Sequence, residues 1–182
     1  MALADTPVCD FGWPAHRFSL SDPSGTLYDS RDLIGPGGLL VAFICNHCPY
    51  VIRIADRLAS DLNALKAQGV GVAAIMSNDY ATYPAYAPDK MTAFAETNGF
   101  EFPYLVDTDQ SVARAFVAVC TPDFFGFNAS GALQYRGRLD DCDHRATAPR
   151  RAELRDAMLQ IAKTGTGPRD QIASMGCSIK WS

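Results

Sequence analysis

Three observations on the 182-residue sequence predict a single α/β domain with a mixed central sheet flanked by helices. With 48% hydrophobic and 20% charged residues, the chain can bury one sizeable core but leaves no room for a second domain. Residues 38–76 carry a strand–helix–strand pattern, and helix and strand patterns continue to alternate after it. We therefore expect one domain over residues 1–182, with a core of about 11–163 and a C-terminal tail, 164–182, that packs on it.

The first predicted element is a β-hairpin added at the N-terminal side of the domain. The stretch FSLSDPSGTLYD, residues 18–29, places a Pro-Ser-Gly turn between two short segments in which apolar and polar residues alternate. Alternation of this kind indicates strands, and the turn residues between them favour a reversal of the chain.

The next pattern predicts a βαβ unit. GLLVAFI, residues 38–44, is a continuous apolar run typical of a strand buried on both faces. From Pro49 the apolar residues recur at spacings of three and four up to Leu65, which predicts an amphipathic helix ended by Gln68-Gly69. VGVAAIM, residues 70–76, predicts a second buried strand, and we expect the two strands to be parallel with a right-handed crossover.

The later patterns continue the α/β alternation. We predict a helix over 89–99, a strand over 102–107 and a helix over 108–119 with Thr108 as its N-cap. Strand-like runs at 120–127 and 132–139 are separated by NASG and predict a second hairpin. The remaining elements are a helix over 148–165, with Pro149 near its start, and a tail in which Ile179 and Trp181 alternate with polar residues. This alternation indicates that the tail packs back on the domain and brings Cys177 toward it.

Two cysteines lie where the first strand of the βαβ unit passes into the helix. Cys45 and Cys48 are separated by two residues, and we expect Cys45 at or near the helix N-cap and Cys48 in the first turn. Parallel strands carry ligand sites and chemistry at this end. The free N–H groups of a helix N-terminus stabilise a thiolate, and this spacing allows a disulfide to form and open. The motif therefore predicts a redox pair or metal ligands.

Composition excludes other kinds of partner. The chain has 16 basic and 20 acidic residues and no basic block, so we expect no nucleic-acid partner. It has no apolar stretch of ~20 residues and no signal-peptide pattern, so we expect no membrane partner and a cytoplasmic location. Six cysteines are too sparse for a disulfide scaffold, and a C-x-x-C pair in that compartment indicates redox or metal chemistry.

Together these motifs resemble the thioredoxin superfamily. The F-x-L-x-D-x-x-G hairpin, the C-x-x-C turn and a Thr-Pro before the second hairpin are closest to the peroxiredoxin-like branch that groups AhpC/TSA and TlpA-type proteins. CNHCPYV, FPYLVD, YRGRLDD and GCSIKW resemble a bacterial subgroup of probable thiol-disulfide isomerases. The resemblance extends from about Phe11 to Trp181. It implies a thioredoxin-like fold and a thiol-disulfide oxidoreductase with no metal or organic cofactor.

The resemblance also implies roles for the two cysteines. Cys45 would be the exposed nucleophile and Cys48 the resolving thiol. The thiolate of Cys45 would attack a substrate disulfide, and Cys48 would resolve the mixed disulfide. Substrates would be disulfides or thiols of proteins or small molecules, and a cellular thiol reductant would regenerate the dithiol.

Four further residues are supporting candidates. Pro122 matches the cis-proline that faces the dithiol in this superfamily, and Thr121 would offer backbone contacts to a bound peptide or thiol. Asn46 and His47 fill the two positions between the cysteines. An imidazole at position 47 can favour the thiolate and make the disulfide more oxidising.

Two other functions remain open. A cysteine peroxidase would use Cys48, although the peroxiredoxin pattern P-x-x-x-T-x-x-C finds Val41 and Cys45 at its proline and threonine places. The alternative is a redox-inert or metal-binding module, for which the chain offers no second C-x-x-C, only scattered candidates such as Cys142 and His144. No acid precedes the dithiol in residues 38–44, so the proton acceptor of Cys48 is unassigned. We expect the acidic cluster at 140, 141 and 143 to be a solvated loop.

Overall fold

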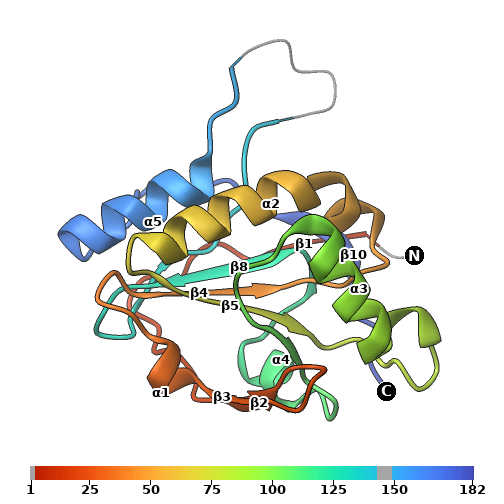
Figure 1. The fold of residues 1–182 in the computed structure, drawn as a ribbon. Helices are drawn as coiled ribbons and strands as arrows, with labels where there is room; N and C mark the ends of the chain where they lie inside the picture. Colours follow the sequence, from red (N-terminus) through yellow and green to blue (C-terminus); the bar gives the residue numbers. More distant parts are fainter. Residues whose placement is uncertain (1–2, 143–148) are drawn as a thin grey trace.

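The computed structural model describes residues 3–142 and 149–182, and within them a seven-stranded mixed sheet forms the centre of the molecule (Figure 1). The strand order is β3-β2-β6-β5-β4-β8-β9. Three neighbouring strands, β4, β5 and β6, are parallel, and the other pairs are antiparallel. The predicted α/β class and mixed sheet are confirmed. The bounds are β2 (Ser19–Ser21), β3 (Leu27–Asp29), β4 (Leu39–Phe43), β5 (Gly71–Met76), β6 (Tyr104–Val106), β8 (Asp123–Phe127) and β9 (Leu133–Tyr135).

Helices cover both faces of this sheet. Figure 1 shows α2 and α5 side by side over one face, with α4 on the opposite side of the sheet. Strand β4 shows why both faces must be covered, since its residues alternate between two buried apolar clusters and none is exposed. The bounds are α1 (Ser30–Leu33), α2 (Pro49–Ala67), the 3₁₀-helix η1 (Pro84–Tyr86), α3 (Pro88–Asn98), α4 (Ser111–Ala115) and α5 (Glu153–Thr164).

The βαβ unit is confirmed in order and direction. Strands β4 and β5 are parallel, with Leu39 opposite Gly71 and Phe43 opposite Ile75. Helix α2 joins them and turns one apolar stripe to the sheet. It ends where predicted, because Gln68 is its C-cap and the next residue, Gly69, has the positive φ of 84° that glycine adopts without strain.

A second, three-stranded sheet pairs strands from the two ends of the described chain and connects them to the short strand that precedes Pro122. Its order is β1 (Leu3–Asp5), β10 (Met175–Ser178) and β7 (Cys120–Thr121), and both pairs are antiparallel. The C-terminal strand therefore lies directly beside the residues that precede Pro122. Ile179 follows it into the apolar cluster on the α4 side of the large sheet. Neither β1 nor the strand character of β10 was expected from the sequence.

Helix α4 is shorter than expected and is capped differently. We expected a helix over 108–119 with Thr108 as N-cap, whereas α4 has five residues and its N-cap is Gln110, with φ of 61°. The reason is Asp107, whose buried carboxylate accepts the N–H groups of Val112 at 3.2 Å and Ala113 at 2.9 Å. Because this carboxylate already satisfies the first-turn amides, no cap at Thr108 is needed.

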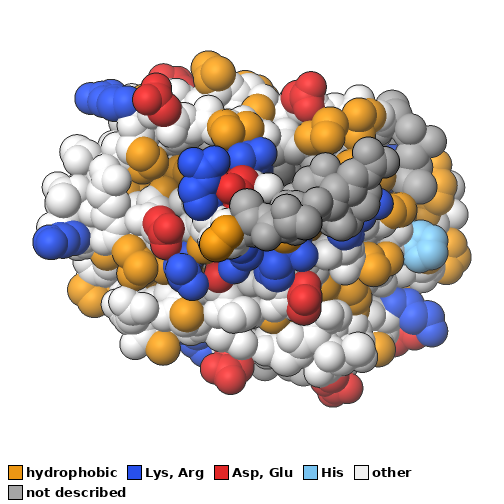
Figure 2. Space-filling view, turned by 90° about the horizontal axis from the view of Figure 1, so that it is seen from above, with side chains coloured by type: hydrophobic (Ala, Val, Ile, Leu, Met, Phe, Trp, Pro, Cys, Tyr) orange, Lys and Arg blue, Asp and Glu red, His pale blue; other side chains and the backbone are white. Residues whose placement is uncertain are grey.

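The expectation of a solvated acidic loop is wrong for Asp140. Its carboxylate is buried and bonds Nε of Arg57 at 2.8 Å and Nε of Arg150 at 2.6 Å. Arg150 also pairs with Asp61 of α2. Residues 149–152 lie outside α5, which begins at Glu153 rather than near Pro149. Figure 2 shows the basic and acidic side chains mixed on this helical face. Positions 143 and 144, named in the sequence analysis, lie outside the described residues.

A buried ion pair holds the start of β8. Asp123 is fully buried, and its carboxylate accepts Nη2 of Arg136 at 2.9 Å and Nε at 3.3 Å. Burial raises the pKa of the Asp123 carboxyl, and the arginine opposes that effect. The guanidinium also lies over the ring of Phe125, 4.3 Å from its centroid. The pair therefore anchors the residue that directly follows Pro122.

Replacing Arg136 by leucine should destabilise the protein strongly, because the Asp123 carboxylate would stay buried without its partner. Removing one member of a buried ion pair costs about 3–5 kcal/mol. Arg138→Leu is the matched control, since its pair with Glu153 is part-exposed and such pairs contribute about 0–1 kcal/mol. Urea denaturation of both variants measures the difference, and equal losses would contradict the assignment.

Candidate active site at the N-terminus of helix α2

The register of two central strands brings the C-x-x-C turn to the Thr121–Pro122 segment. Strands β4 and β8 are antiparallel, and Phe43 is opposite Asp123. Just beyond this pair, the chain leaving β4 reaches Cys45 and the chain entering β8 passes Pro122, whose peptide bond with Thr121 is cis. The cis geometry that the family resemblance implies is thus present. The two segments are more than 70 residues apart in the sequence, and only the sheet places them together.

Thr121 contacts both sulfurs of the motif. Its Oγ1 lies 3.3 Å from Sγ of Cys45, and its carbonyl oxygen lies 3.2 Å from Sγ of Cys48. Its main chain is already paired, because Cys177 of β10 is its partner in the small sheet. The backbone contacts that we expected Thr121 to offer a bound peptide are therefore made by the protein's own C-terminal strand in this structure.

The helix begins about three positions later than expected relative to the cysteines. Cys48, not Cys45, is the N-cap of α2, with extended backbone angles, and Pro49 is the first helical residue. Proline suits that position because it has no N–H to satisfy. As N-cap, Cys48 makes no side-chain capping hydrogen bond, and the N–H of Val51 donates to the Cys48 carbonyl oxygen at 3.0 Å. Cys45 lies three residues earlier, in the turn that leaves β4.

Both cysteines are buried. Cys45 is 1% exposed and Cys48 is 0% exposed, so the expectation that Cys45 is the exposed member of the pair is wrong. They belong to the apolar cluster on the α2 side of the sheet, together with Tyr86 of η1 and Cys177 of β10. The covering strand β10 packs against α2. Both sulfurs are thiols in this structure.

The site stabilises a thiolate on Cys48. The pKa of Cys48 is lowered from 9.0 to about 4, chiefly by its interaction with the Cys45 thiol. Burial raises this pKa, whereas Thr121, Val51 and Cys177 lower it further. The pKa of Cys45 is raised by its hydrogen bond with Cys48 and by burial. The carbonyl of Thr121 accepts from Cys48 only while Cys48 carries its proton. The pair therefore loses its first proton from Cys48 and keeps the second on Cys45.

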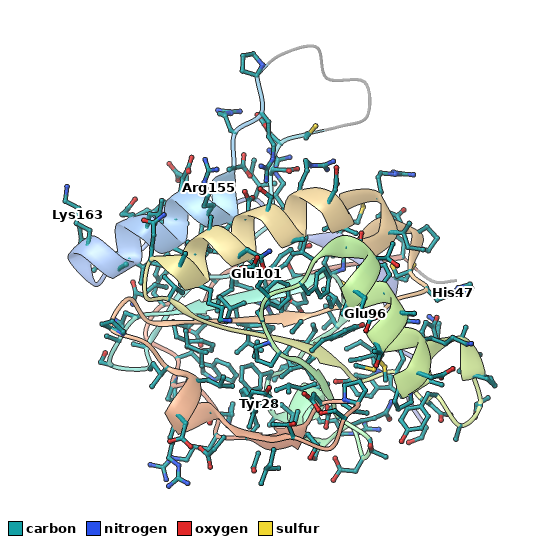
Figure 3. The ribbon with its side chains drawn as sticks, viewed as in Figure 1. Tyr28, His47, Glu96, Glu101, Arg155 and Lys163 are labelled. Atoms are coloured by element: carbon teal, nitrogen blue, oxygen red, sulfur yellow. The ribbon has the colours of Figure 1, made fainter. Side chains whose placement is uncertain are left out.

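Asn46 and His47, the two residues between the cysteines, make different contacts. Asn46 donates from Nδ2 to the carbonyl of Ala85 at 2.6 Å and so ties the turn to η1, while its Oδ1 is buried with no partner in the described part of the chain. His47 lies at the edge of the molecule beside the start of α2 (Figure 3). Its ring packs edge-on against Tyr86, with centroids 6.1 Å apart, and its backbone N–H bonds the Cys45 sulfur.

Sequence reasoning placed Cys177 near the body of the protein but not in this site. Its thiol forms a hydrogen bond with the Cys48 sulfur, and its pKa is raised to about 11, first by burial and then by that bond. Cys120 is also buried, but its sulfur faces the carbonyl of Pro122 at 3.6 Å. Alternation in the tail could predict that Cys177 is buried. It could not identify the sulfur that Cys177 meets, because this depends on the register of β10 against β7.

A groove of about 550 Å³ is lined by Pro122. The first turns of α2 contribute Tyr50, Arg53 and Ile54 to it, and β10 contributes Met175. Within the described residues, no three His, Cys, Asp or Glu side chains are grouped so that they could hold a metal ion. The same part of the chain includes no helix with the length and apolar character needed to cross a membrane.

The sheet order, the cysteine turn after β4 and the cis-proline segment beside it define a thioredoxin-like protein. A thiol:disulfide interchange protein of the thioredoxin family from Chlorobium tepidum TLS shares this fold, with a TM-score of 0.61 at 20% identity, over 87% of this chain and 99% of that one. The chain belongs to the AhpC/TSA family, whose model matches residues 11–136.

Two solved structures resemble the whole chain. An uncharacterized conserved protein from Geobacillus kaustophilus is 36% identical, with a TM-score of 0.92, over 100% of this chain and 97% of that one. A hypothetical protein from Sinorhizobium meliloti 1021 is also 36% identical, with a TM-score of 0.91, over 98% of both chains. The search of curated proteins gave no match.

In the reduced protein, the Cys48 thiolate should be present at neutral pH and should be lost as the pH falls through about 4, because the pKa is lowered to that value. Thiolate absorbance in the ultraviolet measures this titration. Cys48→Ser should abolish it, whereas Cys120→Ser should keep it, since the pKa of Cys120 is raised to about 12. A first thiolate that forms only above about pH 8, near the ordinary cysteine value, would contradict the assignment.

Replacing His47 by alanine should change the Cys48 titration little, because the imidazole is exposed and the Cys45 contact comes from the backbone. Exposed charges contribute about 0–1 kcal/mol, which corresponds to less than about one pH unit. His16→Ala, on the other face of the sheet beside Trp13, is the control. A shift of about two units or more for His47→Ala alone would assign the imidazole a direct role.

Proposed function

We propose that this protein is a thiol-disulfide oxidoreductase that cycles Cys45 and Cys48 between a dithiol and a disulfide. The observation that carries the proposal is the pair of hydrogen-bonded thiols at the N-terminus of the 19-residue helix α2, beside the cis bond of Pro122. A helix N-terminus stabilises the thiolate, which is the reactive form. Membership of the AhpC/TSA family and the shared fold of a thiol:disulfide interchange protein support it.

In the oxidising direction, a substrate thiolate attacks the Cys45 sulfur of the intramolecular disulfide. The bond between the two sulfurs breaks, and Cys48 leaves as a thiolate, which its lowered pKa makes a good leaving group. A second substrate thiolate then attacks the substrate sulfur, and Cys45 leaves and takes up a proton. The substrate gains a disulfide and the protein becomes a dithiol. In the reverse sequence the Cys45 proton passes to the Cys48 thiolate, the Cys45 thiolate attacks a substrate disulfide, and Cys48, deprotonated again, resolves the mixed disulfide.

Cys45 is proposed as the exchanging sulfur because Cys48 is more enclosed. The Cys48 sulfur contacts Thr121, the Val51 N–H and the thiols of Cys45 and Cys177. It can therefore reach only a sulfur held beside it. Since Cys45 is itself 1% exposed, a substrate gains access when the covering segments move. Thr121 and Pro122 would then line the substrate, and the groove beside Pro122 offers room for its flanking residues.

We propose protein or small-molecule disulfides and thiols as substrates, a cellular thiol reductant as the partner that restores the dithiol, and the cytoplasm as the compartment. Chemistry confined to two sulfurs needs neither a metal nor an organic cofactor. The stabilised Cys48 thiolate favours the dithiol form, which makes the disulfide a stronger oxidant.

A cysteine peroxidase is the second candidate, and the lowered pKa of Cys48 in an AhpC/TSA member favours it. The Cys48 thiolate would attack a peroxide oxygen, break the O–O bond and become a sulfenic acid, while water or an alcohol leaves. The Cys45 thiol would then form the disulfide and release water. Val41 and Cys45 stand where the peroxiredoxin pattern has proline and threonine, so the usual peroxide-binding residues are absent from those positions.

Trapping separates the two candidates. Cys48→Ser should accumulate mixed disulfides on Cys45 with protein thiols, because the resolving step is lost, whereas Cys45→Ser should accumulate almost none. Cys120→Ser is the matched control and should behave as the parent chain. The adducts are mapped by mass spectrometry after incubation with oxidised glutathione or with peroxide. Rapid sulfenic acid formation on Cys48 in the Cys45→Ser protein, without mixed disulfides on Cys45 in the other variant, would replace the exchange function with the peroxidase.

A further inference from the structure

Three sulfurs, not two, gather at Thr121. Cys177 is directly opposite Thr121 in the antiparallel pair of β10 and β7, and residues opposite each other in such a pair extend their side chains to the same face. On that face the Thr121 hydroxyl lies 3.3 Å from the Cys45 sulfur. The Cys48 sulfur lies 3.2 Å from the Thr121 carbonyl, and Cys177 belongs to the same buried cluster as Cys45 and Cys48. This third thiol has no part in the exchange reaction proposed above.

We propose that Cys177 is a third redox-active thiol, which exchanges with the Cys45–Cys48 disulfide to form a Cys48–Cys177 disulfide. The proposal rests on the proposed function, since that reaction supplies the starting disulfide. The Cys177 thiolate attacks the Cys48 sulfur, the bond between Cys48 and Cys45 breaks, and Cys45 leaves with the electron pair. Cys45 takes up the proton that Cys177 released. One disulfide is lost and one is formed, so no further oxidant or reductant is needed.

The position of Cys177 decides which sulfur it attacks. Strand β10 is held on both sides, by β1 and by β7, so the Cys177 sulfur has a fixed place. Its sulfur contact is with Cys48, whereas the Cys45 sulfur contacts Thr121 and Cys48. The result of the exchange is therefore specific. Cys45 returns to a thiol, and the oxidising equivalent is stored in a buried disulfide that joins α2 to the C-terminal strand.

The rate of this exchange should depend on pH. Burial raises the pKa of Cys177 to about 11, so only a small fraction is thiolate at neutral pH. The thiolate is the nucleophile, and its fraction grows about tenfold per pH unit below the pKa. The exchange should therefore be slow at neutral pH and faster as the pH rises. Cys120 cannot substitute for Cys177, since it is the neighbour of Thr121 on β7 and neighbouring strand residues extend to opposite faces.

The test oxidises the reduced chain with glutathione disulfide, blocks remaining thiols with N-ethylmaleimide and maps unreduced tryptic peptides. The tryptic peptide 32–53 holds both Cys45 and Cys48, and 170–180 holds Cys177, so a Cys48–Cys177 disulfide joins two peptides that a Cys45–Cys48 disulfide leaves apart. The parent chain should give the joined pair, and fragmentation of the joined peptides should place the link on Cys48. Cys177→Ser should give no joined pair and keep the Cys45–Cys48 disulfide, and Cys120→Ser should match the parent chain.

The pH dependence of the exchange is measured on the parent chain, without any substitution. Its Cys45–Cys48 disulfide, formed first, should convert to the joined pair, and the initial rate should rise about tenfold per pH unit. A parent chain that forms only the Cys45–Cys48 disulfide at every pH would overturn this inference and leave the proposed function standing. A parent chain in which Cys45 forms no disulfide at any time after oxidation begins would instead overturn the proposed function.

Discussion

The constraint on which the site depends is the antiparallel register of β4 and β8, with Phe43 opposite Asp123. Strand β4 is buried on both faces and bonded on both edges, so it has no freedom to slide without moving its whole apolar set to the wrong face. The ion pair of Asp123 and Arg136 fixes the neighbouring strand at the same point. Everything beyond that pair, including the cis bond at Pro122 and the contacts of Thr121 with the sulfurs, follows from this alignment.

The thiolate of the buried Cys48 is stabilised by hydrogen-bond donors of the protein rather than by water. A thiolate in an apolar cluster is destabilised by desolvation, and burial does raise the pKa of Cys45, Cys120 and Cys177. Cys48 is the exception because the Cys45 thiol stabilises its thiolate, with smaller contributions from Thr121, Val51 and Cys177. The order in which the site loses protons is thus set by the donors that each sulfur receives.

The sequence analysis succeeded where structure follows from local pattern and failed where it follows from distant pairing. The βαβ unit around Cys45 and Cys48 could be predicted because the apolar periodicity and the Gln-Gly pair that ends the helix lie in one continuous segment of sequence. The cis bond at Pro122 came from the family resemblance. The burial of Cys45, the contact between Cys48 and Cys177, and the pairing of Asp140 with Arg57 were missed. Each depends on a partner about 80 to 130 residues away, or on a strand placed over the site.

Strand β10 is synthesised after the residues of the site that it covers. It follows every other described element along the chain, and synthesis proceeds from the N-terminus, so the large sheet, α2 and the cysteine turn all leave the ribosome before the strand that covers them. A nascent chain that has reached only α5 holds its dithiol without Cys177 and without the partner strand of Thr121. During that interval the pair is open to any disulfide in solution. Once β10 has paired with β7, a substrate reaches Cys45 only when that strand and its neighbours move.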